Sequence, residues 1–165
     1  MEYIRYYESS LGRILLVGDG EALTGLRFEG QKVFADSPAR TAVEKNLPVF
    51  AEAERWLDIY FSGSDPGFTP EIRLCATAFR KTVWDVLLTV PYGTTVTYGE
   101  IADCVAGRMN LPRMSAQAVG GAVGHNPVSL IIPCHRVVGK DGSLTGYAGG
   151  LERKRKLLEM ERRIP

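Results

Sequence analysis

The sequence is poor in cysteine and histidine. Its cysteines are Cys75, Cys104 and Cys134, an odd and widely spaced set that argues against a disulfide framework. With only two histidines and no close cysteine pair, the chain has no zinc-ligand spacing, so we expect no metal site. Sparse, unpaired cysteines are typical of a protein that works in a reducing compartment.

The sequence also lacks a long hydrophobic run. The longest apolar stretches, Ile14–Val17 and Leu130–Ile132, are too short to cross a bilayer, which predicts no membrane partner. Met1 is followed by the charged residues Glu2 and Arg5 and not by an apolar signal region, so we expect a cytoplasmic protein. A chain of 165 residues, 45% hydrophobic and 24% charged, is the size of one globular domain or two small ones. This composition excludes disordered and fibrous proteins.

The net charge is only +1, but its two signs are separated along the chain. Residues 1–103 hold 10 Lys and Arg against 15 Asp and Glu, a net charge of −5. Residues 104–165 hold 10 against 4, a net charge of +6. A basic half favours contact with a polyanion. The alternative is that the basic run 153–156 is a solvated helix face.

The first half predicts a small sheet followed by a helix. Tyr3–Glu8, Arg13–Val17 and Leu23–Phe28 are short β-prone runs separated by turn residues, which is typical of a meander. One apolar face at helical spacing then predicts an amphipathic helix, with the residues Ala53, Trp56, Leu57, Tyr60 and Phe61. A further strand is expected over Glu71–Leu74, and we place a domain boundary after it, near Cys75 to Thr77, which gives domains 1–75 and 76–165.

The second half predicts mainly helices. Its expected elements are a helix from Phe79 to Val90, a capped helix from Tyr98 to Val105, a helix from Ala116 to Val123 with Ser115 as N-cap, a hairpin through Val137–Leu144, and a basic helix from Leu151 to Arg162. Short helices, a hairpin and a positive charge are typical of a winged helix-turn-helix that binds DNA.

One cysteine has neighbours that suggest chemistry. Cys134 follows an apolar run and a proline, and it precedes His135 and Arg136. Positive neighbours lower the pKa of a thiol, and the thiolate is the nucleophilic form. We therefore expect Cys134 to be an activated thiolate, while Cys75 and Cys104 are expected to be inert. From this local chemistry alone, a cysteine hydrolase or a redox thiol remains open.

The stretch Pro133–Val137 resembles the acceptor-site motif of the O6-alkylguanine–DNA alkyltransferases. The resemblance extends, in the order of the family, through Val90–Gly93, Thr97–Ala102, Ala118–Ala122, Asn126–Pro127, Gly146–Gly150 and Leu157–Glu161. It implies an α+β fold with a small ribonuclease-H-like sheet-and-helix domain over 1–75 and a winged helix-turn-helix domain over 76–165. The first 75 residues match only loosely.

The resemblance implies a single-turnover DNA repair protein. The family transfers the alkyl group of O6-alkylguanine irreversibly onto its cysteine, and O4-alkylthymine is a further candidate substrate. The sulfur displaces the base at the alkyl carbon, and the base needs hydrogen bonding as it leaves. No cofactor is required. The implied partner is double-stranded DNA containing the lesion, bound through the minor groove by a monomer.

The resemblance also implies a role for each matching residue. Cys134 is the nucleophile, His135 the base that acts through a water, Glu161 the carboxylate that orients His135, and Tyr98 the donor to the leaving guanine. From its type alone, Glu161 would be an exposed charge on a basic helix. The residues expected to bind DNA or the flipped base, or to brace the site, are Ser115, Gln117, Gly121, Asn126, Arg136, Tyr147 and Ala148.

One position departs from the family pattern. Gln117 stands where the family usually has an arginine that fills the gap left by the extruded nucleotide. Glutamine is shorter and uncharged, which puts the strength of DNA binding in doubt but not the transfer chemistry. A non-enzymatic lesion-binding protein on the same fold is the alternative function, although such relatives lack the cysteine that is present here.

Overall fold

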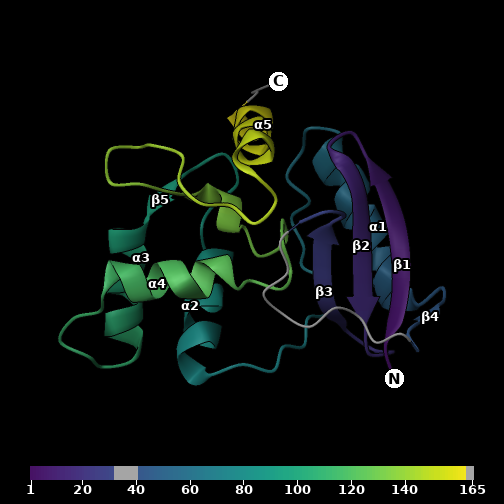
Figure 1. Cartoon of the computed structure of the whole chain (residues 1–165), viewed down its shortest axis with the longest axis horizontal. Coiled ribbons are helices and arrows are strands. Elements are labelled where there is room, and N and C mark those ends of the chain that lie inside the picture. Colours follow the sequence, from purple (N-terminus) through teal and green to yellow (C-terminus); the bar gives the residue numbers. More distant parts are fainter. Residues whose placement is uncertain (32–40, 163–165) are drawn as a thin grey trace. The chain divides into compact units, whose positions relative to one another are not determined.

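The computed structural model describes residues 1–31 and 41–162. The chain divides into two compact units, Met1–Leu74 and Cys75–Pro165. The first unit holds a sheet and one long helix, and the second holds four helices with a short two-stranded sheet (Figure 1). The α+β class predicted from the sequence is confirmed.

The sheet of the first unit is built on an antiparallel meander. Strands β1 (Tyr3–Ser9), β2 (Gly12–Gly18) and β3 (Leu23–Phe28) lie at the predicted places, and β4 (Val43–Glu44) adds in parallel beside β1. The strand expected over Glu71–Leu74 does not form. It is reduced to a single bridge between Ile72 and Leu23, so that prediction is corrected.

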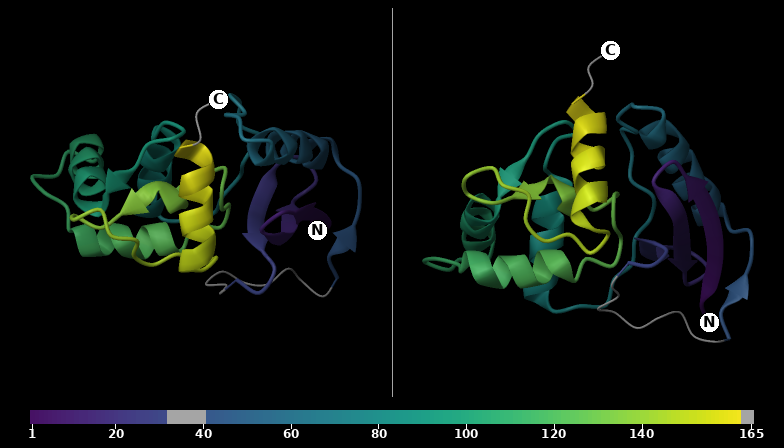
Figure 2. Two further views of the ribbon diagram at one scale, coloured as in Figure 1. Left: turned by 90° about the horizontal axis from the view of Figure 1, so that it is seen from above. Right: turned by 45° about the horizontal axis from the view of Figure 1, so that its top comes forward.

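Helix α1 (Pro48–Phe61) supplies the other half of this unit's core, and the two turned views show it lying along the sheet (Figure 2). The expected apolar face is buried at Ala53, Trp56, Leu57 and Tyr60, while Phe61 is only half-buried. The helix packs closely against β2. A Cβ added to Gly18 of β2 would lie only 3.1 Å from the ring of Phe50 in α1.

The second unit is a cluster of three helices with a fourth across it. Helices α2 (Ala78–Leu88), α3 (Tyr98–Arg108) and α4 (Ala116–Gly124) contact one another, and α5 (Leu151–Arg162) contacts the segment that carries Cys134. A buried hydrogen bond joins α2 to α4: the indole Nε1 of Trp84 donates to the Ala122 carbonyl over 2.9 Å.

The helix starts follow from capping. Thr97 Oγ1 accepts from the Glu100 amide and Glu100 Oε1 accepts from the Thr97 amide, both over 3.1 Å, which completes the predicted capping box of α3. Helix α3 runs on to Arg108, beyond the expected end at Val105. Ser115 caps α4 through the Ala118 amide, as predicted.

The predicted hairpin after Cys134 is wrong in its pairing. Strand β6 (Val137–Val138) pairs in parallel with β5 (Val96–Thr97), far away in sequence. The following turn does close, with the Gly139 amide 2.8 Å from the Ser143 carbonyl, but no strand follows it within residues 141–150. Both valines of β6 are buried, so they pair inside the unit and not with the exposed turn.

The capping box predicts a measurable loss of stability in Thr97→Ala. We expect the free energy of unfolding of the second unit to fall by about 1 kcal/mol, because the Glu100 amide at the start of α3 loses its acceptor. Urea unfolding followed by Trp84 fluorescence, in a Trp56→Phe background, reports on this unit. Glu100→Gln is the matched control, since glutamine can still accept from the Thr97 amide. Equal losses in both variants would contradict the capping argument.

Candidate active site

Cys134 begins a single 3-10 turn, η1 (Cys134–Arg136), that leads into β6. The turn follows a buried segment, 128–132, in which Leu130 adopts a positive φ of 69°. The Cys134 residue is 7% exposed, whereas Cys75 and Cys104 are exposed. The chain therefore places one of its three cysteines in an enclosed polar site.

The environment of the thiol corrects the expectation of a free thiolate. Burial raises the pKa of Cys134 above its ordinary value, while a hydrogen bond from the Asn126 side chain and the charge of Lys154 act in the opposite direction without offsetting it. The neighbouring Arg136 does not activate the thiol as expected, because its guanidinium is bound to Glu161 and to the Val90 carbonyl. A thiol held neutral in this way needs a base to remove its proton.

That base is available in the next residue. His135 is fully buried, and its Nε2 lies 2.5 Å from Oε2 of Glu161. Burial lowers the pKa of His135, so the ring is neutral near pH 7. Burial alone would raise the pKa of Glu161, but hydrogen bonds and charge from His135 and Arg136 lower it to about 2. Glu161 is therefore ionised.

These protonation states fix the tautomer of the imidazole. An ionised carboxylate can only accept, so the proton of neutral His135 is on Nε2, which donates to Glu161. The lone pair is then on Nδ1, which is the atom that can take a proton from the thiol. The hypothesis of an exposed Glu161 is wrong, since this residue is 4% exposed.

Arg136 is buried and pairs with the Glu161 carboxylate. The prediction that Arg136 binds DNA is therefore corrected. Its Nε donates to Oε1 of Glu161 over 2.8 Å, its Nη2 reaches Oε2 over 3.3 Å, and its Nη1 donates to the Val90 carbonyl over 2.8 Å. A guanidinium that is buried and held by these acceptors is not placed to bind DNA. Gly93 also donates to Glu161, and with φ at +80° it occupies a conformation that favours glycine.

Asn126 braces the segment before the nucleophile. Its Nδ2 donates to the Ile132 carbonyl over 2.8 Å, and its Oδ1 accepts from the Val128 amide over 3.0 Å. The same side chain forms the hydrogen bond to Cys134 that opposes the effect of burial on the thiol pKa. One amide thus fixes both the path of the chain and the sulfur.

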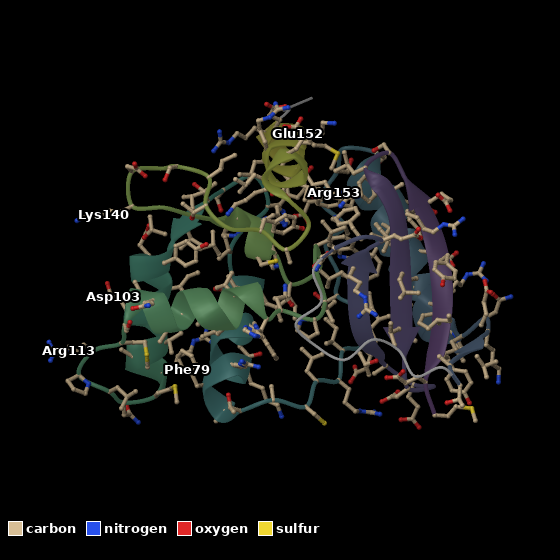
Figure 3. All side chains as sticks on the ribbon, viewed as in Figure 1. Phe79, Asp103, Arg113, Lys140, Glu152 and Arg153 are labelled. Atoms are coloured by element: carbon tan, nitrogen blue, oxygen red, sulfur yellow. The ribbon has the colours of Figure 1, made fainter. Side chains whose placement is uncertain are left out.

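The loop before α5 forms another part of the surroundings. The Tyr147 residue is half-buried but its hydroxyl oxygen is fully covered, and burial raises its pKa well above the ordinary value. The charges of Cys134 and Glu161 act on the same hydroxyl. Ala148 is half-buried, and the carbonyl of Gly149 accepts from Arg153 over 3.1 Å. Figure 3 labels Arg153 at α5.

The sequence analysis missed Lys154. It belongs to the basic run that was weighed as a solvated face, yet its side chain is fully buried. Its Nζ donates to the carbonyls of Val137 and Thr145, over 2.5 and 2.7 Å. The missed signal was helical spacing, because Lys154, Leu157, Leu158 and Glu161 share one face of α5 and all are buried.

The remaining candidate residues belong to α3 and α4. Ser115, the N-cap of α4, is exposed, and so are Gln117 and Gly121 within the helix. Tyr98, at the start of α3, lies against α4, since a Cβ on Gly120 would be 3.7 Å from its ring. Figure 3 labels Arg113 in the loop between α3 and α4. The structure thus brings together Cys134, His135, Glu161, Asn126, Arg136 and Tyr147, and it leaves Ser115, Gln117 and Gly121 exposed.

Two absences hold within the described part of the chain. No helix in residues 1–31 and 41–162 is long and apolar enough to span a membrane. Over the same residues, no cluster of three or more histidine, cysteine, aspartate or glutamate side chains could hold a metal ion.

Family models match both units of the chain. Residues 3–74 match the model described as 6-O-methylguanine DNA methyltransferase, ribonuclease-like domain, and residues 78–163 match the DNA binding domain of the same methyltransferase. The Haemophilus influenzae methylated-DNA–protein-cysteine methyltransferase is 43% identical over 161 residues, covering 97% of this chain and 86% of that protein.

Solved structures agree with the family models. The crystal structure of the Mycobacterium tuberculosis O6-methylguanine methyltransferase is similar, with a TM-score of 0.84 and 44% identity over 100% of this chain and 96% of that one. A complex of the M. tuberculosis protein with DNA has a TM-score of 0.83 and 43% identity, over 97% and 92% of the two chains.

The buried carboxylate predicts a pH-dependent stability difference between the wild type and Glu161→Gln. The pKa of Glu161 is about 2 in the folded chain against an ordinary value of 4.5, so its ionised form stabilises the fold above pH 4.5. That stability is lost as the pH falls towards 2. We expect the variant to be about 3 kcal/mol less stable near pH 7, with the difference shrinking below about pH 5.

Urea unfolding of both proteins between about pH 7 and pH 3 measures this difference. Glu159→Gln is the matched control, because Glu159 lies on the same helix and pairs with Arg155 at the surface. We expect the control to change stability by less than about 1 kcal/mol at any pH. A Glu161→Gln difference that does not depend on pH would contradict the assignment of an ionised buried carboxylate.

Proposed function

The chain belongs to the 6-O-methylguanine DNA methyltransferase family, and we propose that Cys134 is the residue that accepts the alkyl group from O6-alkylguanine in DNA. The protein is a methylated-DNA–protein-cysteine methyltransferase that repairs DNA by direct alkyl transfer. The observation that carries the assignment of Cys134 is its enclosed thiol, which directly precedes a buried histidine whose Nδ1 is left as the basic nitrogen.

The proposed step is a displacement at the alkyl carbon. His135 takes the thiol proton, directly or through one water, and the bond between sulfur and carbon forms as the bond between carbon and O6 breaks. Glu161 stabilises the imidazolium that results, because its ionised carboxylate accepts from Nε2. The guanine leaves with negative charge developing on the ring, and the Tyr98 hydroxyl donates to it. No cofactor takes part.

The product explains why each molecule acts once. A thioether is not an acyl or phosphoryl group, so water has no easy route to regenerate the thiol. O4-alkylthymine presents the same alkyl–oxygen bond and is a second proposed substrate. A non-enzymatic lesion-binding protein would not need the ordered His135 and Glu161 pair, and a hydrolase would turn over.

We propose that the DNA interface is α4 in a winged helix-turn-helix. The contact between helices α3 and α4 supports this proposal, which assigns the turn after β6 as the wing. The exposed face of α4 carries Ser115, Gln117 and Gly121, and small residues there permit close approach to the sugar-phosphate backbone in the minor groove. The lesion base must leave the stack, since its reactive carbon is not reachable within a duplex.

The same proposal assigns the loop residues and the first unit. Tyr147 and Ala148, in the loop before α5, close over the flipped base. The first unit has a ribonuclease-H-like architecture, and the protein binds the lesion as a monomer. The effect of the Cys134 charge on the Tyr147 hydroxyl supports the assignment of the loop, and the ribonuclease-like description of the matching model supports the assignment of the first unit.

Stoichiometric alkylation of Cys134 tests the proposed function. After incubation with an O6-methylguanine oligonucleotide, we expect mass spectrometry to find one added methyl group per protein, mapped to Cys134 and not to the exposed Cys75 or Cys104. Cys134→Ala is the control. It should lose transfer but keep its affinity for lesion DNA within a few-fold, because other groups hold the DNA. Continued turnover by a fixed amount of protein would show that the function is different.

Gln117→Arg tests the placement of α4 in the duplex. An arginine at this exposed position adds a cation close to phosphates, so DNA binding should tighten, most of all at low salt, with about one more unit of slope in log affinity against log salt. Transfer should also accelerate if base extrusion limits the rate. Binding and single-turnover rates are measured at two salt concentrations.

Two further variants make this result specific. Thr69→Arg adds the same charge at an exposed position in the first unit and should change binding much less. Gln117→Ala should weaken binding, because it removes the side chain that fills the vacated stack. If Gln117→Ala behaves as the wild type and Gln117→Arg has no effect, residue 117 does not enter the duplex and the proposed orientation of α4 is wrong.

A further inference from the structure

Lys154 is a buried cation in the first turn of α5. Its side chain is fully buried, and its Nζ donates to the carbonyls of Val137 and Thr145, with the Gly146 carbonyl at a longer 3.5 Å. No carboxylate of the described residues forms an ion pair with it within 4.0 Å. An ammonium group that is buried without a carboxylate is costly, so its retention in the fold calls for a compensating role.

The carbonyls that Lys154 binds belong to two different segments. Val137 lies in β6, directly after the turn that carries Cys134, and Thr145 and Gly146 lie in the loop that leads to Tyr147. Strand β6 is only two residues long, and Gly146 has a positive φ of 36°. The ammonium group thus joins a short strand to a loop that contains no strand within residues 141–150.

The charge of Lys154 also acts on the nucleophile. It favours the thiolate of Cys134, and the thiolate in turn favours the charged form of Lys154. Burial lowers the pKa of Lys154 to about 8, so the group is still mostly charged at pH 7. The other titratable groups around the thiol are His135 and Arg136 on η1, Tyr147 in the loop, and Arg153 and Glu161 on α5.

Of these groups, Arg136 and Glu161 neutralise each other. Their nitrogen and oxygen atoms lie 2.8 Å apart, and both side chains are buried. His135 is neutral because burial lowers its pKa, and burial raises the pKa of Tyr147, which keeps that hydroxyl protonated. Arg153 donates to the Gly149 carbonyl, in the loop before α5. Lys154 is the cation of this cluster that is fully buried and held by the carbonyl of β6, the strand that directly follows the Cys134 turn.

We propose that Lys154 is a positioning residue for the acceptor cysteine: its ammonium group fixes the Thr145–Gly146 backbone against Val137 of β6, directly after the Cys134 turn, and holds a positive charge there that acts on the thiol. The inference rests on the proposed function in that Cys134 is the acceptor. The lysine charge acts in addition to the His135 base. A fixed cation stabilises the thiolate and so lowers the free-energy cost of removing the thiol proton in a buried site.

The test measures the reactivity of Cys134 towards iodoacetamide, which needs neither DNA nor a lesion. Rates are followed from about pH 6 to pH 10 by peptide mass spectrometry, with Cys75 and Cys104 as internal standards in each sample. In Lys154→Met and Lys154→Gln we expect the rate at Cys134 near pH 7 to fall about tenfold and its pH midpoint to rise by about one unit. The two standards should not change.

Two variants separate charge from structure. Lys154→Arg keeps the cation and should restore most of the reactivity. Lys156→Gln removes an exposed lysine of the same helix and should match the wild type. If folded Lys154→Met and Lys154→Gln proteins keep the wild-type pH midpoint, Lys154 does not act on the thiol and the proposal is wrong.

A measurement on chains that keep Lys154 covers the case in which variants at position 154 do not fold. The Lys154 Nζ is titrated by NMR in Cys134→Asp and in Cys134→Ala. Because a negative charge at position 134 favours the charged lysine, the Lys154 midpoint should lie at higher pH in Cys134→Asp than in Cys134→Ala. Equal midpoints in the two variants would overturn the proposal.

The reactivity assay also separates this inference from the proposed function. A wild-type protein that fails to take methyl from DNA would refute the function, yet the iodoacetamide rates would still measure the effect of Lys154. Conversely, normal methyl transfer with wild-type pH profiles in the Lys154 variants would refute the inference alone.

Discussion

The carboxylate of Glu161 is ionised although the residue is only 4% exposed, and the site is arranged to meet that cost. Two cationic or proton-donating side chains, His135 and Arg136, come from the turn that carries the nucleophile, and an amide comes from Gly93. A buried carboxylate without such partners would take up a proton. Since the partners come from η1 and from the turn after α2, compensation of one charge holds three segments together and fixes the tautomer of the base.

Much of the fold could be predicted from local patterns. The meander, the apolar face of α1 and the capping box of α3 depend on neighbours within a few residues, and the structure has them at the expected places. The pairing of β5 with β6 could not be predicted, because two-residue strands have no periodicity and their contact spans about forty residues. The expected hairpin was a reasonable local alternative, but burial of Val137 and Val138 favoured the long-range partner.

The candidate site shows the same division. The proposed nucleophile and the proposed base are adjacent in sequence, so Cys134 and His135 could be predicted from local chemistry together with the family resemblance. Composition alone was misleading for Lys154 and Glu161, which belong to a strongly charged helix but share its buried face with Leu157 and Leu158. Reading charge by helical face, and not by its density along the chain, would have separated these two from the exposed Arg155 and Lys156.

Cys134, the proposed nucleophile, follows an irregular segment, and the energetics explain how that segment is held. Leu130 has a φ of 69°, which costs a non-glycine residue about 1–2 kcal/mol. The side chains of Leu130, Ile131 and Ile132 are all buried, and each contributes about 1.5–3 kcal/mol, so burial outweighs the strain. Asn126 then accepts from the Val128 amide and donates to the Ile132 carbonyl, which also accepts from the Cys134 amide over 2.8 Å. Because Asn126 follows the C-cap of α4 and also bonds to Cys134, the helix proposed to meet DNA and the reacting sulfur are connected through one amide.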